Sequence, residues 1–483
     1  MKLPFKITAQ AMLVIVASLI LQGAEQSIPS PSIAELTAKA EKGDDQAQYY
    51  LGLDYANGKF VQKNPALAVQ WLKKAAEQGH LMAQYTLGVM YQNGDAGKVD
   101  TKLALHWYRE SAKQGLALSQ NNLAGMYANA IGIEKDPVAA FQFYQQAAEQ
   151  GLMPAQYNLG LAYANGDGVQ KNPSLAIKWL QKAAEQGSAY AQYFLGDIYN
   201  QAWDATITRN AALAAHWYQK AADQGIAVAQ HNLGVMYAKG DGVEKNPVIA
   251  FQLYQKAAEQ GLALSQYNLG LIYTMGNAVP RNMSLAAKWY QKAAEQGEAY
   301  SQCNLGAMYA NGDGVEKNPA IAVHWYQKSA EQGNMLAQYN LGNRYAEGNG
   351  VGRDPVLAAK WYEKAAEQGH AMAQANTGWA YATGTGVAKD EGKALFWFYQ
   401  ARNGRLNIQA GQFVNQYIFN MEKTLSSDAI QQAQKQAREY SQKYNSQQMP
   451  PQDMRATIPL SPVILPLPPP YPLDQHGNPS QKN

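Results

Sequence analysis

Three of the seven histidines in this 483-residue chain stand at nearly regular spacing and are the first candidates for acid–base or metal chemistry. His106, His216 and His324 each precede a Trp-Tyr pair and are separated by 110 and 108 residues. A metal site or proton relay needs its groups within a few ångströms of one another. Equivalent residues of separate repeats are held apart, so we expect an ordinary polar face, with no catalytic residue and no metal ligand.

Cys303 is the only cysteine of the chain, and it stands where other segments carry Tyr267 or Tyr339. No histidine is matched to it, so we expect a packing thiol rather than a nucleophile. A single cysteine also excludes a disulfide framework and a metal–thiolate site. The Asn-Gly-Asp-Gly loops at 165–168 and 311–314 lack the alternating acidic ligands and terminal Glu of an EF-hand. We expect turns there, and no cofactor.

These residues are positioned by a repeat of about 36 residues. The glycine of an Ala-Ala-Glu-Gln-Gly phrase recurs in steps of 36, with one step of 38 and a last step of 35. The longer step replaces the usual connection by residues 201–210, and such an insertion belongs in a loop. Asn or Asp followed by Pro, as at Asn172-Pro173, predicts the start of a helix, here called the Asn-Pro helix. The glycine predicts its end.

A second, shorter helix is predicted between that glycine and the next Asn-Pro. Ala155, Leu159 and Tyr163 follow helical spacing, and the Leu-Gly pair in this segment gives the Leu-Gly helix its name here. A helical Gly160 costs roughly 1 kcal/mol relative to alanine, so its recurrence indicates close approach of another helix. Such short helices are marginal alone and must stack. The sequence predicts an all-α fold, an α/α superhelical solenoid of about ten 36-residue helix pairs with helical caps.

The repeat also resembles a known family. Residues 155–169 read Ala-Gln-Tyr-Asn-Leu-Gly-Leu-Ala-Tyr-Ala-Asn-Gly-Asp-Gly-Val, and Lys-Ala-Ala-Glu-Gln-Gly follows at 182–187. This unit is similar to the Sel1-like repeat (SLR), a relative of the tetratricopeptide repeat, and the resemblance covers residues 44–404. It implies a superhelix that binds proteins. Some exported members pair cysteines within each repeat and have been connected with β-lactam binding, and this chain lacks those cysteines.

The ends of the chain differ from the repeats. Lys2 and Lys6 precede an apolar run at 11–21, which is typical of a secretory signal peptide and too short to span a bilayer comfortably. A retained anchor is the weaker alternative. Ser32 and Glu35 form a capping-box pattern. The dense prolines after residue 450 favour an extended tail, which serves as a spacer or as a docking peptide.

The sequence therefore predicts five segments. They are a signal peptide at 1–24, an N-terminal capping helix at 25–43, ten repeats at 44–404, a C-terminal helical cap at 405–447 and a Pro-rich flexible tail at 448–483. We expect an exported protein, periplasmic or secreted. The hydrophobic share of 47% is sufficient for a packed core.

The charge of the chain bears on its partners. The net charge of +3 falls to +1 without the two leader lysines, which argues against nucleic acid. We expect proteins or peptides as partners, no membrane span in the mature chain, and an oligomeric state that the sequence does not determine. The predicted function is a non-enzymatic interaction scaffold or adaptor of the cell envelope. The alternative is a regulator or enzyme of cell-wall (peptidoglycan or β-lactam) metabolism.

The candidate binding face lies on the Leu-Gly helices. At about 100° per residue, Tyr157 and Asn158 turn away from the face that buries Ala155 and Leu159, and should line the interior of the superhelix. Asn offers a donor and an acceptor, and Tyr offers contact area, so an extended peptide suits this face. Alternatively, both residue types pack and hydrogen-bond between neighbouring helices. The candidates are Tyr85, Tyr157, Asn158, Tyr193, His231, Asn232, Tyr267, Asn268, Asn304, Tyr339, Asn340, Arg344 and Trp379. Four residues break the pattern of the two columns, namely His231, Arg344, Trp379 and Asp197, and specificity often resides in such exceptions.

Overall fold

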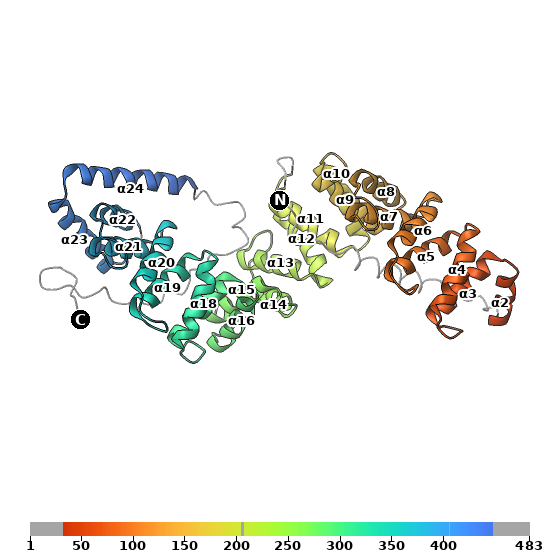
Figure 1. Cartoon of the computed structure of the whole chain (residues 1–483), viewed down its shortest axis with the longest axis horizontal. Helices are drawn as coiled ribbons and strands as arrows, with labels where there is room; N and C mark the ends of the chain where they lie inside the picture. Colours follow the sequence, from red (N-terminus) through yellow and green to blue (C-terminus); the bar gives the residue numbers. More distant parts are fainter. Residues whose placement is uncertain (1–31, 204–206, 405, 448–483) are drawn as a thin grey trace. The chain divides into compact units, whose positions relative to one another are not determined.

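The computed structural model of the chain describes residues 32–203, 207–404 and 406–447. These residues form helices joined by short loops and contain no strand. Successive helices pack in pairs, which confirms the predicted all-α solenoid of ten repeats with further helices at both ends (Figure 1). The predicted signal peptide at 1–24 and the predicted tail at 448–483 lie outside the described residues.

The chain divides into two compact units, Met1–Gln224 and Gly225–Asn483. In the described part, the first unit holds one leading helix and five helix pairs. Their bounds are α2 Ile33–Glu41, α3 Asp45–Asn57, α4 Pro65–Glu77, α5 Leu81–Asn93, α6 Thr101–Lys113, α7 Ala117–Asn129, α8 Pro137–Glu149, α9 Met153–Asn165, α10 Pro173–Glu185, α11 Ala189–Gln201 and α12 Ala211–Asp223.

The second unit holds five helix pairs and two closing helices in its described part. Their bounds are α13 Ala227–Lys239, α14 Pro247–Glu259, α15 Ala263–Met275, α16 Met283–Glu295, α17 Ala299–Asn311, α18 Pro319–Glu331, α19 Met335–Glu347, α20 Pro355–Glu367, α21 Ala371–Thr383, α22 Glu391–Asn403, α23 Ile408–Thr424 and α24 Ser427–Gln447. Even-numbered helices from α4 to α22 are the Asn-Pro helices, and the odd-numbered ones from α3 to α21 are the Leu-Gly helices.

Capping residues begin and end the Asn-Pro helices where the sequence predicts. The side chain of Asn172 accepts a hydrogen bond from the amide of Leu175, Pro173 takes the first helical position, and Gly187 follows the helix with a φ of +96°. Only glycine adopts that φ at low cost. The expectation of a shorter Leu-Gly helix is wrong, because α9 continues to Asn165 and ends at left-handed Gly166, so α9 and α10 have 13 residues each.

The glycine of the Leu-Gly helix marks the closest contact within a repeat. A Cβ placed on Gly160 would lie 2.7 Å from the side chain of Leu180, and one on Gly270 would lie 2.5 Å from the ring of Tyr290. Neighbouring side chains therefore fill the space that any larger residue would need, which confirms the predicted helix crossing. A Cβ placed on the loop glycine Gly168 would collide with the carbonyl oxygen of Pro137 in the preceding repeat.

The insertion at residues 201–210 falls between α11 and α12, as expected of a loop. Trp203 from this segment packs edge-on against Phe194, with ring centroids 6.3 Å apart. Ile207 joins the same hydrophobic core. Trp203 and Ile207 thus add apolar contacts to the core of the fifth repeat, and α11 and α12 keep 13 residues each.

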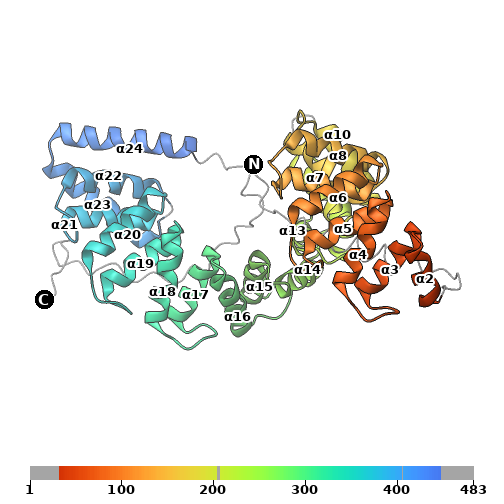
Figure 2. The same cartoon turned by 45° about the vertical axis from the view of Figure 1, so that its right-hand side comes forward.

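Additional helices cover both ends of the repeat array. The side chain of Ser32 and that of Glu35 form the predicted capping box at the start of α2. At the other end, α24 lies across α22 (Figures 1 and 2), with Ala433 and Ala437 buried between them. The side-chain amide of Gln400 donates to the carbonyl oxygen of Ala437 at 2.7 Å.

Candidate functional site

Glutamine side chains join the two helices of a repeat to each other and to the preceding repeat, and thereby position the candidate face. Gln186 donates to the side-chain oxygen of Gln156 at 2.7 Å, and Gln338 accepts in the same way from Gln368 at 2.8 Å. The amide of Gln338 in turn donates to the carbonyl oxygen of Ala330 in the preceding repeat at 3.2 Å. Sequence reasoning missed this glutamine ladder, although both glutamines recur in almost every repeat, 30 residues apart.

The predicted tyrosine column lies largely inside the protein. Tyr85, Tyr157 and Tyr339 are buried, while Tyr193 and Tyr267 are half-buried. Tyr157 packs against Phe194 of the next Leu-Gly helix, with ring centroids 5.9 Å apart. These rings therefore contribute packing between and within repeats. Their predicted role in binding a partner stays a prediction.

The asparagine column reaches the surface. Asn158, Asn232, Asn268, Asn304 and Asn340 are all partly exposed. The second unit carries one such asparagine on each of its five successive Leu-Gly helices. We call this set the amide row: Asn232, Asn268, Asn304, Asn340 and Asn376.

Several members of the amide row keep their hydrogen-bonding groups available. Within the described part of the chain, the side chains of Asn268, Asn340 and Asn376 form no hydrogen bond. Asn304 differs, because it hydrogen-bonds to Tyr290. In the first unit, Asn158 donates to the side-chain oxygen of Asn121 at 3.3 Å. Free amides on a half-exposed face are suited to bind the backbone of another chain.

Apolar side chains accompany the amide row one helical turn earlier, at position i−4. We call them the apolar row: Val228, Leu264, Tyr300, Leu336 and Met372. All are at least partly exposed, and Leu264 and Tyr300 reach 41% and 45% exposure. Residues four apart share one face of a helix. Sequence reasoning missed this row, and its signal was the large apolar residue directly before each buried Ala or Ser of the Leu-Gly helix.

The predicted exceptions to the pattern lie at different depths. His231 is buried, its Nδ1 lies 2.8 Å from the hydroxyl oxygen of Ser265, and burial lowers its pKa to about 4. Trp379 is half-buried against the core of the last repeats. Arg344 is half-buried on α19, at the position that Met308 fills on α17. The structure does not gather these three side chains into one site.

Asp197 is the remaining exception, and it is buried. Its carboxylate accepts a hydrogen bond from the hydroxyl group of Tyr218 at 2.5 Å. Burial raises the pKa of this carboxyl group above its usual range. In the repeat where Leu180 replaces that tyrosine, the position of Asp197 holds Leu161. Asp197 is therefore the partner of a buried hydroxyl group within its own repeat.

The three spaced histidines and the single cysteine, the first candidates for acid–base or metal chemistry, lie on separate helices. His106, His216 and His324 lie exposed on α6, α12 and α18, each ring edge-on to the following tryptophan. Cys303 is buried, and burial raises the pKa of its thiol to about 12. Among the described residues, no three His, Cys, Asp or Glu side chains are close enough to hold a metal ion.

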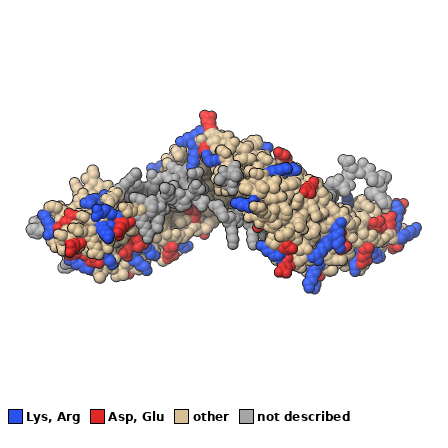
Figure 3. All heavy atoms as spheres, turned by 90° about the horizontal axis from the view of Figure 1, so that it is seen from above, with Lys and Arg blue, Asp and Glu red and all other residues tan. Residues whose placement is uncertain are grey.

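The surface carries charges of both signs. On the face drawn in Figure 3, the Lys and Arg side chains are interspersed with Asp and Glu. A contact surface for nucleic acid would gather positive charge. None of the helices in the described ranges is long and apolar enough to cross a membrane.

Stacked helix pairs with a half-exposed amide and apolar face define an α/α solenoid repeat protein. Comparison with known families gives the same result and names the family. Ten Sel1 repeats match the chain, and the chain therefore belongs to the Sel1 repeat family. The matched residues are 45–80, 81–116, 117–152, 154–188, 189–226, 227–262, 263–298, 299–334, 336–370 and 371–404. Repeats of this family generally mediate protein–protein interaction, and the fold is typically a non-catalytic scaffold.

Two solved structures are similar to the chain over most of its length. One is c5321, a protective antigen of uropathogenic Escherichia coli strains with an SLR fold. It is 35% identical, covers 86% of this chain and 96% of its own, and has a TM-score of 0.62. The other is a Sel1 repeat protein from Oxalobacter formigenes, 30% identical over 68% of this chain and 92% of its own, with a TM-score of 0.52. Among curated proteins, none matches the chain.

Proposed function

We propose that this chain is a non-enzymatic adaptor of the cell envelope that binds extended segments of partner proteins along the amide row and the apolar row. The observation that carries the proposal is the uninterrupted run of five asparagines on successive Leu-Gly helices of the second unit. Three of them, Asn268, Asn340 and Asn376, have side-chain amides without a partner in the described residues.

The chemistry of the two rows suits an extended backbone. A side-chain amide offers a donor and an acceptor together, so it pairs with a peptide group whatever the residue type. The apolar row adds contact area, and removing this apolar surface from water favours binding. Amides would hold the partner's backbone, and the differing sizes of Val228, Leu264 and Tyr300 would select among its side chains.

Site-specific photocrosslinking in the full-length protein tests the proposed face. A photoreactive amino acid at Asn304 should capture a protein partner in native cells. The same group at Gln291, an exposed residue on Asn-Pro helix α16, serves as the matched control. Partners captured equally from both sites, or from neither, would argue against the proposed face.

Substitution of the free amides gives a quantitative test. Replacing Asn268 and Asn340 together by alanine removes two amides that form no hydrogen bond in the described part of the protein. At roughly 1 kcal/mol for each hydrogen bond to the partner, affinity for a captured partner should fall about tenfold or more. Thermal unfolding should stay unchanged, because neither side chain supports the fold.

The envelope location is part of the proposal and rests on the leader. Lys2, Lys6 and the apolar run at 11–21 match the pattern of a secretory signal. Fractionation of cells that express the full chain should place it outside the cytoplasm, with the first residues removed in the mature protein. Recovery in the cytoplasm with an intact leader would limit the proposal to its binding function.

A further inference from the structure

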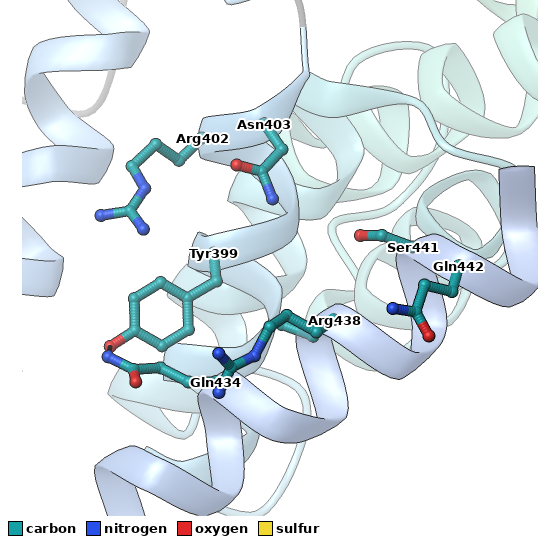
Figure 4. Close-up of a pocket in the computed structure, with 8 residues that line it drawn as sticks. Tyr399, Arg402, Asn403, Gln434, Arg438, Ser441 and Gln442 are labelled. Atoms are coloured by element: carbon teal, nitrogen blue, oxygen red, sulfur yellow. Dashed lines mark hydrogen bonds between the residues drawn. The ribbon is translucent and has the colours of Figure 1, made fainter.

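An open groove of about 390 Å³ lies between the last Asn-Pro helix and the closing helix of the second unit. Helix α22 contributes Arg402 and Asn403, and α24 contributes Gln434, Arg438 and Gln442. The buried ring of Tyr399 lies at its base. Figure 4 shows the groove with its polar side chains, among them the guanidinium groups of both arginines.

The two arginines leave the groove positively charged. In the described part of the chain, no carboxylate forms an ion pair with Arg402 or Arg438, and both side chains are exposed. The guanidinium carbon of Arg402 lies 5.0 Å from the centre of the Tyr399 ring, which holds it over this ring. The carboxylate of Glu422 accepts a hydrogen bond from the hydroxyl group of Tyr399 at 2.6 Å and keeps its negative charge, but it is not among the residues that line the groove.

Side-chain amides line the same groove. Gln434 donates to the hydroxyl oxygen of Tyr399 at 3.3 Å, which turns its amide into the groove wall. Asn403 and Gln442 supply further donors and acceptors on opposite helices. A guanidinium group presents parallel N–H donors that match the two oxygens of a carboxylate or phosphate. The neighbouring amides suit the polar atoms attached to such a group.

We propose that this groove binds an oxyanion, a carboxylate or a phosphate, between Arg402 and Arg438. A volume of about 390 Å³ accommodates a small acid or the last residues of a peptide with a free carboxyl terminus. The site lies on the closing helices and not on the amide row. It therefore goes beyond the proposed adaptor function and does not depend on it.

Calorimetric titration of the full-length protein tests this site with two probes. N-acetyl-alanyl-alanine carries a free carboxylate, and its C-terminal amide is the neutral control. Inorganic phosphate is the second probe and identifies phosphate as the source of the oxygens. One of the two anions should bind at low ionic strength, and binding should weaken as salt screens the charges. The neutral amide should not bind.

Four variants test whether any binding occurs in the groove. Arg402→Gln and Arg438→Gln should each weaken binding about tenfold or more, because each removes a charge-assisted contact. Lys435→Gln is the matched control, since it removes the same charge from α24 at an exposed residue that pairs with Glu439. Arg438→Lys keeps the charge and loses the planar fork, and should weaken binding to an intermediate extent.

The binding of the two probes to the variants decides whether the oxyanion site exists. Binding of the free acid or of phosphate that Arg438→Gln abolishes and Lys435→Gln preserves supports the site. Binding of neither probe, or an equal loss in Arg438→Gln and Lys435→Gln, overturns it. Thermal unfolding of each variant shows that the closing helices remain folded. Arg438 is exposed and has no ion pair in the described part, so its loss should leave the unfolding temperature unchanged.

Discussion

The ring of Tyr290 lies against the backbone of Gly270, so close that a methyl group on residue 270 would come within 2.5 Å of it. The ring is buried and its hydroxyl group lies 3.4 Å from that of Thr274 on the same Leu-Gly helix. It therefore cannot move aside without losing packing on all sides. The same relationship recurs between Gly342 and Tyr362.

Gly270→Ala should destabilise the second unit by about 1–3 kcal/mol, the usual cost of overpacking a core. Gly125→Ala is the matched control. Its Cβ would meet only the Tyr144 hydroxyl oxygen, at an ordinary 3.7 Å, because Ala124 occupies the crossing position there. This change should be neutral or stabilising by up to about 1 kcal/mol from helix propensity. Urea unfolding followed by circular dichroism measures both, and equal effects would contradict the packing argument.

Gln338→Leu should cost about 1–3 kcal/mol, because it removes two hydrogen bonds of a buried side chain, the one donated to the carbonyl oxygen of Ala330 and the one accepted from Gln368. Gln291→Leu provides the comparison, since Gln291 is exposed and donates only to Glu295 on its own helix. That change should stay within about 0.5 kcal/mol. The measurement is again the free energy of unfolding in urea. Similar values for the two variants would rule out the ladder as a source of stability.

His231 should make the protein sensitive to acid. Burial lowers its pKa from 6.5 to about 4, so between these values the unfolded chain takes up a proton that the folded protein does not. The contribution of His231 to the free energy of unfolding is therefore highest above pH 6.5. It falls by up to about 3 kcal/mol as the pH is lowered toward 4, because protonation of His231 favours the unfolded chain. His231→Tyr removes the titrating group, so the difference between wild type and variant should change over that interval.

A second variant separates titration from packing at this residue. Ser265→Ala removes the hydroxyl partner of His231 and keeps the imidazole. It should lower stability at every pH and leave the slope between pH 6.5 and 4 in place. If the unfolding free energy of this variant did not change with pH, the hydroxyl group of Ser265, and not burial, would be the cause of the lowered pKa of His231. The measurement is the free energy of unfolding of wild type, His231→Tyr and Ser265→Ala at intervals across pH 4–8.

Ala130→Gly should stabilise the third repeat. Ala130 ends α7 with a φ of +58°, in the left-handed region that disfavours residues with a Cβ, whereas the equivalent Gly166 ends α9 with a φ of +81°. Relief of that strain is worth about 1 kcal/mol. The reverse change, Gly166→Ala, should cost a similar amount, because its Cβ would make only ordinary contacts at 3.5 Å. Hydrogen exchange of the α7 and α9 amides measures both effects locally.

The helix ends and the repeat were predictable because their causes are local. Asn172 caps its own helix through a contact three residues away, and Gly187 terminates it two residues after its last helical residue. Such chemistry is visible within a window of a few residues. The stacking of one pair on the next followed from the shortness of the helices, which are marginal in isolation, and the family resemblance implied the same superhelix.

The candidate face was less predictable, because a helical wheel shows which side of the helix a residue faces and does not show how deeply it is buried. Tyr157 and Asn158 are adjacent in sequence and were predicted to face the same side, yet the tyrosine is buried against Phe194 and the asparagine is partly exposed. What covers a residue depends on the adjacent repeat, about 36 residues away. The glutamine ladder escaped notice for the same reason, since Gln156 and Gln186 are 30 residues apart.

The hydrogen bonds of the glutamine ladder have one direction along the chain, from each donor to an acceptor earlier in the sequence. Gln338 accepts a hydrogen bond from its own repeat and donates one to the carbonyl oxygen of Ala330 in the preceding repeat, so a repeat of this kind depends on its N-terminal neighbour in the same unit for an acceptor. At the start of the array, α2 supplies that acceptor when Gln48 donates to Ala40. Deleting whole repeats from the C-terminal side would leave each remaining glutamine donor of this kind with its acceptor in the preceding repeat. Trimming from the N-terminal side would strand a buried amide unless a helix like α2 were grafted ahead of the new first repeat.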